Sequence, residues 1–239
     1  PPPPAAPPRP HPQCLHSLPT LRSPDLYHPT VEGWIAPLNE AGYRVIALDN
    51  RGHGKSTKYY DDADYSLDAM AGDVSGLIDG LGLVSPHVMG YSMGARITAT
   101  LAAMRGQDLG KIIFAGNGYN MIEGGFDTSL VRDALLADSL EDAAPGVGRD
   151  FRVFAEKTGN DLKALAACIR GRMIPREVFE GITNEALVII GEEDEIGVDG
   201  DRLAALMPSG RFESVPRRNH MNVVGDKVYK AKVLEFLAG

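Results

Sequence analysis

The chain has 239 residues, a length that suits one α/β domain with a modest insertion and a core of its own. Hydrophobic residues make up 44% and charged residues 23%, and the net charge of −8 gives no electrostatic reason to bind nucleic acid or an anionic membrane surface. No apolar run approaches the roughly 18 residues of a membrane span, and the first residues lack the pattern of a secretory leader, so we expect a cytoplasmic protein without nucleic-acid or membrane partners.

Residues 1–30 differ in composition from the rest of the chain, because they hold 11 of the 17 prolines. Proline removes backbone hydrogen-bond donors and favours an extended, unpaired chain. We therefore expect residues 1–30 to form an irregular segment that contributes no regular strand to a sheet, with an imperfect pairing of Gln13–Leu18 as the alternative.

Strands and helices are predicted to alternate over residues 31–118. Tyr43–Asp49 is a short apolar run with β-branched residues, which is typical of a buried parallel strand. Apolar residues then recur at helical spacing over Ser66–Leu81. The alternation continues with a strand at His87–Met89, a helix at Met93–Arg105 and a strand at Lys111–Ala115.

The same pattern returns over residues 183–239 and predicts an α/β fold with a doubly wound, mostly parallel sheet. The predicted elements are a strand at Ala186–Ile190, a helix at Asp201–Met207, a strand at Arg211–Val215 and a helix at Asp226–Leu237. Between the two segments, residues 119–182 contain only helical stretches, at Ser129–Leu140, Phe151–Lys157 and Asp161–Arg170. An all-helical insertion is expected to lie over the sheet edge as a lid.

The strongest chemical signal is Gly90-Tyr91-Ser92-Met93-Gly94, which follows a predicted strand and opens a predicted helix. A G-x-S-x-G motif in this context forms a sharp turn that exposes the serine hydroxyl above the sheet. Glycine is needed on either side because larger side chains would clash there. The sequence therefore predicts Ser92 as a nucleophile and the Met93 N–H as a donor to an oxyanion hole.

A serine nucleophile needs a base, and His220 is the best candidate among the six histidines. It lies between the last predicted strand and the last helix, at the carboxyl end of the sheet, although a plain surface histidine is the alternative. Asp194 follows the strand at Ala186–Ile190 and would orient the imidazole. The acidic neighbours that compete for this role are Glu192, Glu193 and Glu195.

These motifs together resemble the α/β-hydrolase family over residues 31–239. The matching segments are Gly42–Asp49, Arg51-Gly52-His53-Gly54-Lys55-Ser56, the Gly90–Gly94 motif, Gly191-Glu192-Glu193-Asp194 and Asn219-His220. The chain order of serine, aspartate and histidine is also that of the family. The resemblance implies that His53 belongs to a structural loop near the site and is not the base, and that residues 119–182 form a helical lid.

One departure from the family concerns its first strand, which ends in a His-Gly motif that supplies a second oxyanion donor. The nearest equivalent here is Leu15-His16-Ser17-Leu18, with serine in place of glycine. Because residues 1–30 are not expected to contain a strand, the sequence predicts an incomplete oxyanion hole.

We therefore expect a serine hydrolase that cleaves a carboxylic ester or related acyl bond of an apolar small molecule, without a cofactor or a metal. The fold does not choose among esters, lactones, thioesters, carbon–carbon bonds and haloperoxidation. The alternative is a non-catalytic or weakly active hydrolase-fold protein. Nucleotide binding through Gly54-Lys55-Ser56-Thr57 is disfavoured because Asp49 stands where a P-loop needs glycine.

Overall fold

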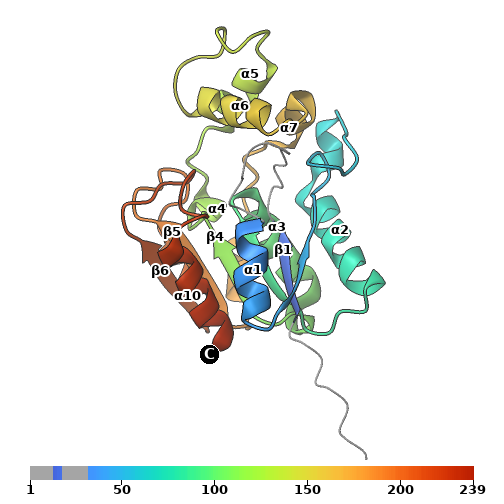
Figure 1. The fold of residues 1–239 in the computed structure, drawn as a ribbon, viewed down its shortest axis with the longest axis vertical. Helices are drawn as coiled ribbons and strands as arrows, with labels where there is room; N and C mark the ends of the chain where they lie inside the picture. Colours follow the sequence, from blue (N-terminus) through green and yellow to red (C-terminus); the bar gives the residue numbers. More distant parts are fainter. Residues whose placement is uncertain (1–12, 18–31) are drawn as a thin grey trace, which may run out of the picture.

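The computed structural model describes residues 13–17 and 32–239, which form a six-stranded sheet with helices on both faces (Figure 1). The strands lie in the spatial order β2–β1–β3–β4–β5–β6, and all neighbouring pairs are parallel. Their bounds are β1 Gln13–Ser17, β2 Arg44–Ala47, β3 His87–Tyr91, β4 Ile112–Ala115, β5 Ala186–Gly191 and β6 Gly210–Val215. The predicted α/β fold with a doubly wound, parallel sheet is confirmed.

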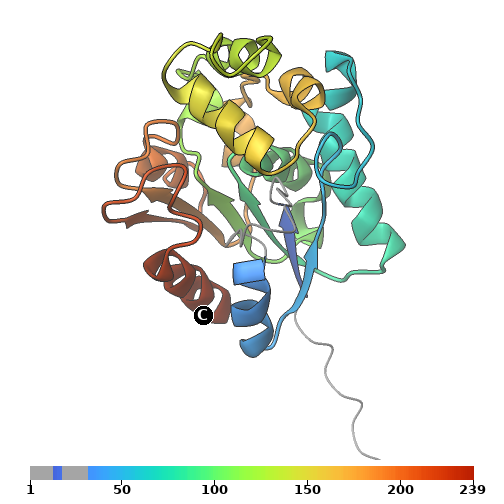
Figure 2. The same ribbon diagram turned by 45° about the horizontal axis from the view of Figure 1, so that its top comes forward.

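Helices connect the strands and cover both faces of the sheet. Their bounds are α1 Glu32–Glu40, α2 Leu67–Gly80, α3 Met93–Arg105, α4 Asn120–Glu123, α5 Thr128–Leu136, α6 Val147–Lys157, α7 Leu162–Cys168, α8 Arg176–Glu180, α9 Gly200–Ala204 and α10 Lys227–Ala238. Two short 3₁₀ segments, η1 Asp62–Tyr65 and η2 Gly106–Asp108, accompany them. Helices α1 and α10 lie on one face of the sheet, and α2 and α3 lie on the other (Figures 1 and 2).

Strand β4 shows why its sequence is continuously apolar. Ile112 and Phe114 enter the core that contains residues of α2 and α3, whereas Ile113 and Ala115 enter the core that contains residues of α1 and α10. All four side chains are fully buried. Successive residues of a strand point to opposite faces, so a central strand covered by helices on both sides needs apolar residues at every position.

The expectation that residues 1–30 contribute no strand is wrong for Gln13–Ser17. These residues form β1, a central strand that pairs with β2 on one side and β3 on the other, with Leu15 opposite both Ile46 and Val88. None of the five residues of β1 is a proline, so each keeps the backbone N–H that a central strand needs for its hydrogen bonds. The rest of that expectation, for residues 1–12 and 18–30, lies outside the described residues.

Helix α1 was missed by the sequence analysis because Pro37 lies in its interior. A proline removes one intrahelical hydrogen bond and usually indicates a helix end. Here Trp34 and Leu38, four residues apart, are buried together against the sheet, and this packing compensates for the lost bond.

Residues 119–182 contain α4 to α8, and α5, α6 and α7 lie beyond the carboxyl ends of the strands (Figures 1 and 2). These three helices bury a small core of their own, formed by Val131, Leu135, Ala155, Leu165 and Ala166. No helix within residues 32–239 combines the length and the apolar character needed to cross a bilayer.

Candidate active site

The turn between β3 and α3 presents Ser92 in a strained backbone conformation, with φ of 55° and ψ of −117°. Glycine is required at position 90, because a Cβ there would lie 2.0 Å from the carbonyl oxygen of Gly94. Met93 is the first residue of α3, so its N–H has no acceptor within the helix. The turn therefore places a hydroxyl and a backbone donor side by side.

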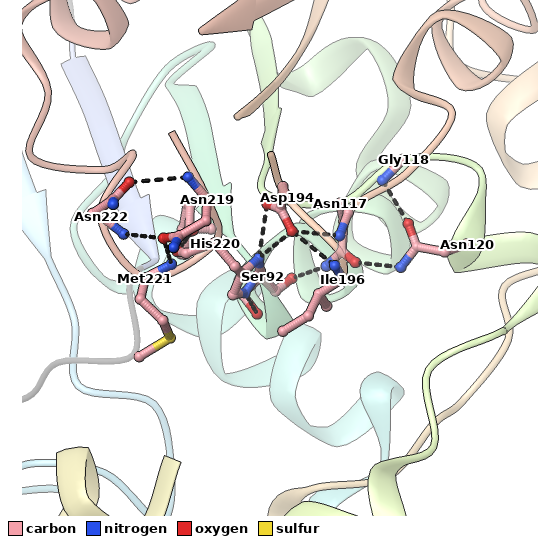
Figure 3. A network of polar contacts seen from close by, with 12 residues as sticks. Ser92, Asn117, Gly118, Asn120, Asp194, Ile196, Asn219, His220, Met221 and Asn222 are labelled. Carbon is pink, nitrogen blue, oxygen red and sulfur yellow. Dashed lines mark hydrogen bonds and ion pairs between the residues drawn. The ribbon is translucent and has the colours of Figure 1, made fainter. Parts of the chain in front are cut away.

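His220 lies in the loop between β6 and α10, and its side chain is buried. Its Nε2 atom lies 2.9 Å from the Oγ atom of Ser92 (Figure 3). Two asparagines shape the turn around it. The Oδ1 atom of Asn219 accepts from the N–H groups of Met221 and Asn222, and the Oδ1 atom of Asn222 accepts from the Asn219 N–H.

Asp194 lies on the opposite side of the imidazole from Ser92, with its Oδ2 atom 2.9 Å from Nδ1 of His220. Its Oδ1 atom accepts hydrogen bonds from the backbone N–H groups of Ile196, at 2.9 Å, and Gly197, at 2.8 Å (Figure 3). The carboxylate is completely buried. The competing residues Glu192, Glu193 and Glu195 are all exposed, so burial and geometry single out the aspartate.

Gly191 allows the loop that carries His220 to cross the end of β5. A Cβ on Gly191 would lie 2.2 Å from the carbonyl oxygen of Arg218, so the backbones approach too closely for any other residue. The same carbonyl accepts a hydrogen bond from the Glu193 N–H at 2.9 Å. This crossing brings His220 to Asp194, although they are far apart in sequence.

Two buried asparagines that the sequence analysis did not single out support the serine turn. Asn117 donates from its Nδ2 atom to the backbone carbonyl of Ser92 at 2.6 Å. Asn120 donates to Oδ1 of Asn117 and accepts from the Gly118 N–H, both at 2.8 Å (Figure 3). Their position just after the strand at Lys111–Ala115, at the carboxyl end of the sheet, is the signal that could have indicated them.

A cavity of about 400 Å³ lies between Ser92 and the helical insertion. Its apolar lining includes Phe126, Val131, Leu135, Phe151, Phe154 and Leu165, all from residues 119–182. Cys168 also lines the cavity as a free thiol, and burial raises its pKa to about 12. The cavity can hold a small, largely apolar molecule against the serine hydroxyl.

His53 also lines the cavity, but the structure brings His220 and not His53 to the serine hydroxyl. The His53 ring is buried, and its Nδ1 atom lies 3.1 Å from the carbonyl oxygen of Arg51. Burial lowers the pKa of His53, and this effect outweighs the opposing effect of the hydrogen bond to Arg51.

Comparison with known proteins identifies relatives of this chain. Residues 14–164 match a family described as having the alpha/beta hydrolase fold. The chain is 28% identical over 221 residues to a Caulobacter segnis protein named as a carbamate hydrolase, a match that covers 82% of this chain and 81% of that one. It is 35% identical over 104 residues to epoxide hydrolase B of Mycobacterium tuberculosis, but the match covers 39% of this chain and only 29% of that protein.

A solved structure with the same fold is the bromoperoxidase of Bacillus anthracis, with a TM-score of 0.76 and 23% sequence identity. That match covers 95% of this chain and 92% of the bromoperoxidase. At this level of identity the likeness shows that the fold is shared, and it carries no information about the reaction.

Proposed function

The chain belongs to the alpha/beta hydrolase fold family, and we propose that it hydrolyses a carboxylic ester or a related acyl bond through Ser92, His220 and Asp194. The observation that carries the proposal is the continuous chain of hydrogen-bond contacts from the Ser92 hydroxyl to His220 and on to the buried Asp194 carboxylate. Nucleophile, base and orienting carboxylate in this order are the parts of a serine hydrolase.

In the proposed reaction, Oγ of Ser92 attacks the carbonyl carbon while Nε2 of His220 takes the hydroxyl proton. The Nδ1–H group of His220 donates to Asp194, which holds the ring in this tautomer and stabilises the imidazolium. The Met93 N–H stabilises the negative charge on the carbonyl oxygen. As the tetrahedral intermediate collapses, the leaving alcohol takes the proton from His220, and an acyl-enzyme remains.

Water then completes the cycle by the same groups. His220 takes a proton from the water molecule, the resulting hydroxyl attacks the acyl carbon, and the proton returns to Oγ of Ser92 as the acid leaves. The contact between Nε2 of His220 and Oγ of Ser92, which lines the cavity, supports a mechanism in which one base serves both steps. In the family a second oxyanion donor comes from the chain that follows the first strand, and here that chain lies outside the described residues.

We propose further that the site is divided between a core of residues 31–118 and 183–239 and a lid of residues 119–182. The apolar side chains that the insertion contributes to the cavity support this division, as does the separate small core of α5, α6 and α7. An apolar lid would limit the access of bulk water to the bound substrate during the formation of the acyl-enzyme.

The acyl-bond class is supported by the relative named as a carbamate hydrolase, since a carbamate is an acyl derivative and the match extends along most of both chains. The match to the epoxide hydrolase covers less than a third of that protein, so it carries less weight for the reaction.

The proposal is tested with 4-nitrophenyl esters of graded chain length and with a fluorophosphonate probe for reactive serines. We expect release of nitrophenolate and a single modification, which peptide mapping places on Ser92. A folded protein that accepts neither the probe nor any ester would contradict the proposal and indicate a hydrolase fold without catalysis.

A further inference from the structure

Arg96 lies one helical turn after Ser92 on α3, and it lines the same cavity. Among the described residues, its guanidinium group donates only to backbone carbonyls. Nη1 lies 2.6 Å from the carbonyl oxygen of Arg172 and 3.4 Å from that of Met121, and Nη2 lies 3.3 Å from that of Asn120. Carbonyl acceptors orient a guanidinium group, but they do not neutralise its charge.

The charge of Arg96 has no counterion within residues 32–239, where no carboxylate lies at ion-pair distance from it. Arg105, on the same helix, pairs with Asp79 at 2.8 Å. Burial lowers the pKa of Arg96, although an arginine side chain keeps its charge in proteins. A partly buried charge without a partner is costly, and such a charge in the wall of a cavity indicates an anionic ligand.

The rim of the cavity is also cationic. Arg132, Arg170 and Arg172 line a second hollow, which shares Thr128, Ile169, Arg170 and Gly171 with the cavity above Ser92. Asp62 is the acidic residue that these arginines contact. Its carboxylate pairs with Arg132 and Arg170, and its backbone carbonyl accepts from Arg172. Asp127 also lines the cavity, and its carboxylate caps α5 by accepting from Ser129. Three guanidinium groups against the carboxylates of Asp62 and Asp127 leave this rim with a net positive charge in a chain whose net charge is −8.

We propose that the substrate of this site carries a carboxylate several bonds from the scissile acyl group, and that Arg96 binds this carboxylate. The inference rests on the proposed acyl hydrolysis and names its substrate class. Ser92, directly before α3, and Arg96, in its first turns, both line the cavity, so one small molecule can present its acyl carbon to Ser92 and its carboxylate to Arg96. The planar guanidinium group matches a carboxylate and forms charge-assisted hydrogen bonds with it.

The competing interpretation is that Arg96 only ties α3 to the insertion through Asn120, Met121 and Arg172. Such a tie would affect every substrate alike, whereas a carboxylate site affects only anionic ones. Two substrates separate these interpretations: mono-4-nitrophenyl adipate, and its methyl ester, which has the same leaving group and nearly the same length but no charge.

The variants are Arg96→Met, Arg96→Lys and the control Arg105→Met, which removes an arginine of the same helix outside the cavity. We expect the wild-type protein to prefer the free acid. Arg96→Met should lower kcat/KM for the acid by about 10- to 100-fold, mostly through KM, and change that for the methyl ester by about twofold or less. Arg96→Lys keeps the charge and should give a smaller loss, again confined to the acid, and Arg105→Met should change neither. Equal losses for both substrates would overturn the proposal.

Binding separates this inference from the proposed function. In Ser92→Ala protein, calorimetric titration with monophenyl adipate and methyl phenyl adipate measures the carboxylate preference without catalysis. A preference for the acid that Arg96→Met abolishes supports the site even if no ester is hydrolysed, and Arg96→Lys serves as the test if Arg96→Met does not fold. Equal binding of the two ligands overturns the inference, even if both adipates are hydrolysed.

Discussion

The hydroxyl group of Tyr91 donates a hydrogen bond to the backbone carbonyl oxygen of His220. This bond joins the strand that leads into the serine turn to the loop that carries the proposed base. The two rings also lie against each other, with centroids 5.2 Å apart. Burial is the main reason why the pKa of Tyr91 is raised well above its usual value, so the hydroxyl group remains a donor throughout the working pH range.

Tyr91→Phe should therefore lower kcat more than it affects KM. The substitution keeps the ring contact but leaves the His220 carbonyl without this donor, which costs about 1–3 kcal/mol when the group stays buried. We expect a fall in kcat of about tenfold or more and a lower melting temperature. Full activity in a variant with an unchanged melting temperature would show that the bond does not position His220.

Asn117→Ala should also reduce catalysis. The Nδ2 group of Asn117 donates a hydrogen bond to the carbonyl oxygen of Ser92 at 2.6 Å and so stabilises the strained backbone at the serine. We expect a loss of kcat of about tenfold, since a hydrogen bond of this kind contributes on the order of 1 kcal/mol. Asn160→Ala is a matched control, because the Asn160 side chain bonds only to Thr158 of the insertion among the contacts described. If both variants retain the wild-type kcat, the serine turn does not depend on this amide.

Asp194→Asn should lower kcat by about 10³- to 10⁴-fold, because an amide would favour the wrong imidazole tautomer. His220→Ala should be at least as damaging, since groups that act as a unit fail together. Glu193→Gln serves as the control, because this neighbouring acid is exposed. Comparable losses in Glu193→Gln and Asp194→Asn would argue against the assignment of Asp194.

Stability should fall on acidification, and His87 identifies one cause. Its Nδ1 atom accepts a hydrogen bond from the Lys111 N–H at 2.8 Å, so the folded state needs a neutral ring. The pKa of His87 is lowered in the folded protein, mainly by burial and to a smaller extent by the charge of Lys111. The unfolded chain thus binds a proton more readily, and the free energy of unfolding should decrease as the pH falls below about 6.5.

The measurement is urea denaturation at about pH 7.5 and about pH 5.5 for the wild-type protein and His87→Asn, which offers an acceptor that does not titrate. We expect a smaller acid-induced loss in the variant. His53 contributes in the same direction, because burial lowers its pKa as well, so part of the loss should remain. An identical loss in both proteins would exclude a role for His87.

The sequence was sufficient to select Ser92, Asp194 and His220, because each follows a predicted strand and the carboxyl ends of parallel strands meet at one edge. The structure brings their side chains into contact, and the catalytic roles of the three residues are proposed from these contacts. Strand β1 could not be predicted, since the prolines around it dominate the composition while its pairing with β2 and β3 depends on distant residues. Local preference and tertiary context conflict in that segment.

The residues that support the serine turn and line the cavity were also difficult to identify from the sequence. The position of Asn117 and Asn120 after a strand makes them candidates, but asparagines are typical of turns, so that position alone does not separate them from ordinary loop residues. In the sequence, Arg96 cannot be distinguished from any other polar residue of a helix. Only the folded structure shows that it lines the cavity and that no counterion pairs with it among the described residues. Positions that depend on the crossing of distant loops, such as Gly191 over Arg218, need the folded chain.

The role of Ser92 as the nucleophile is best tested by measuring the kcat of Ser92→Ala on the preferred 4-nitrophenyl ester. Alanine lacks the hydroxyl group and is smaller, so the fold should be retained, which circular dichroism verifies. We predict a loss of at least about 10³-fold. If a folded variant keeps more than about a few per cent of wild-type activity, Ser92 is not the nucleophile, because catalysis then proceeds without the serine hydroxyl.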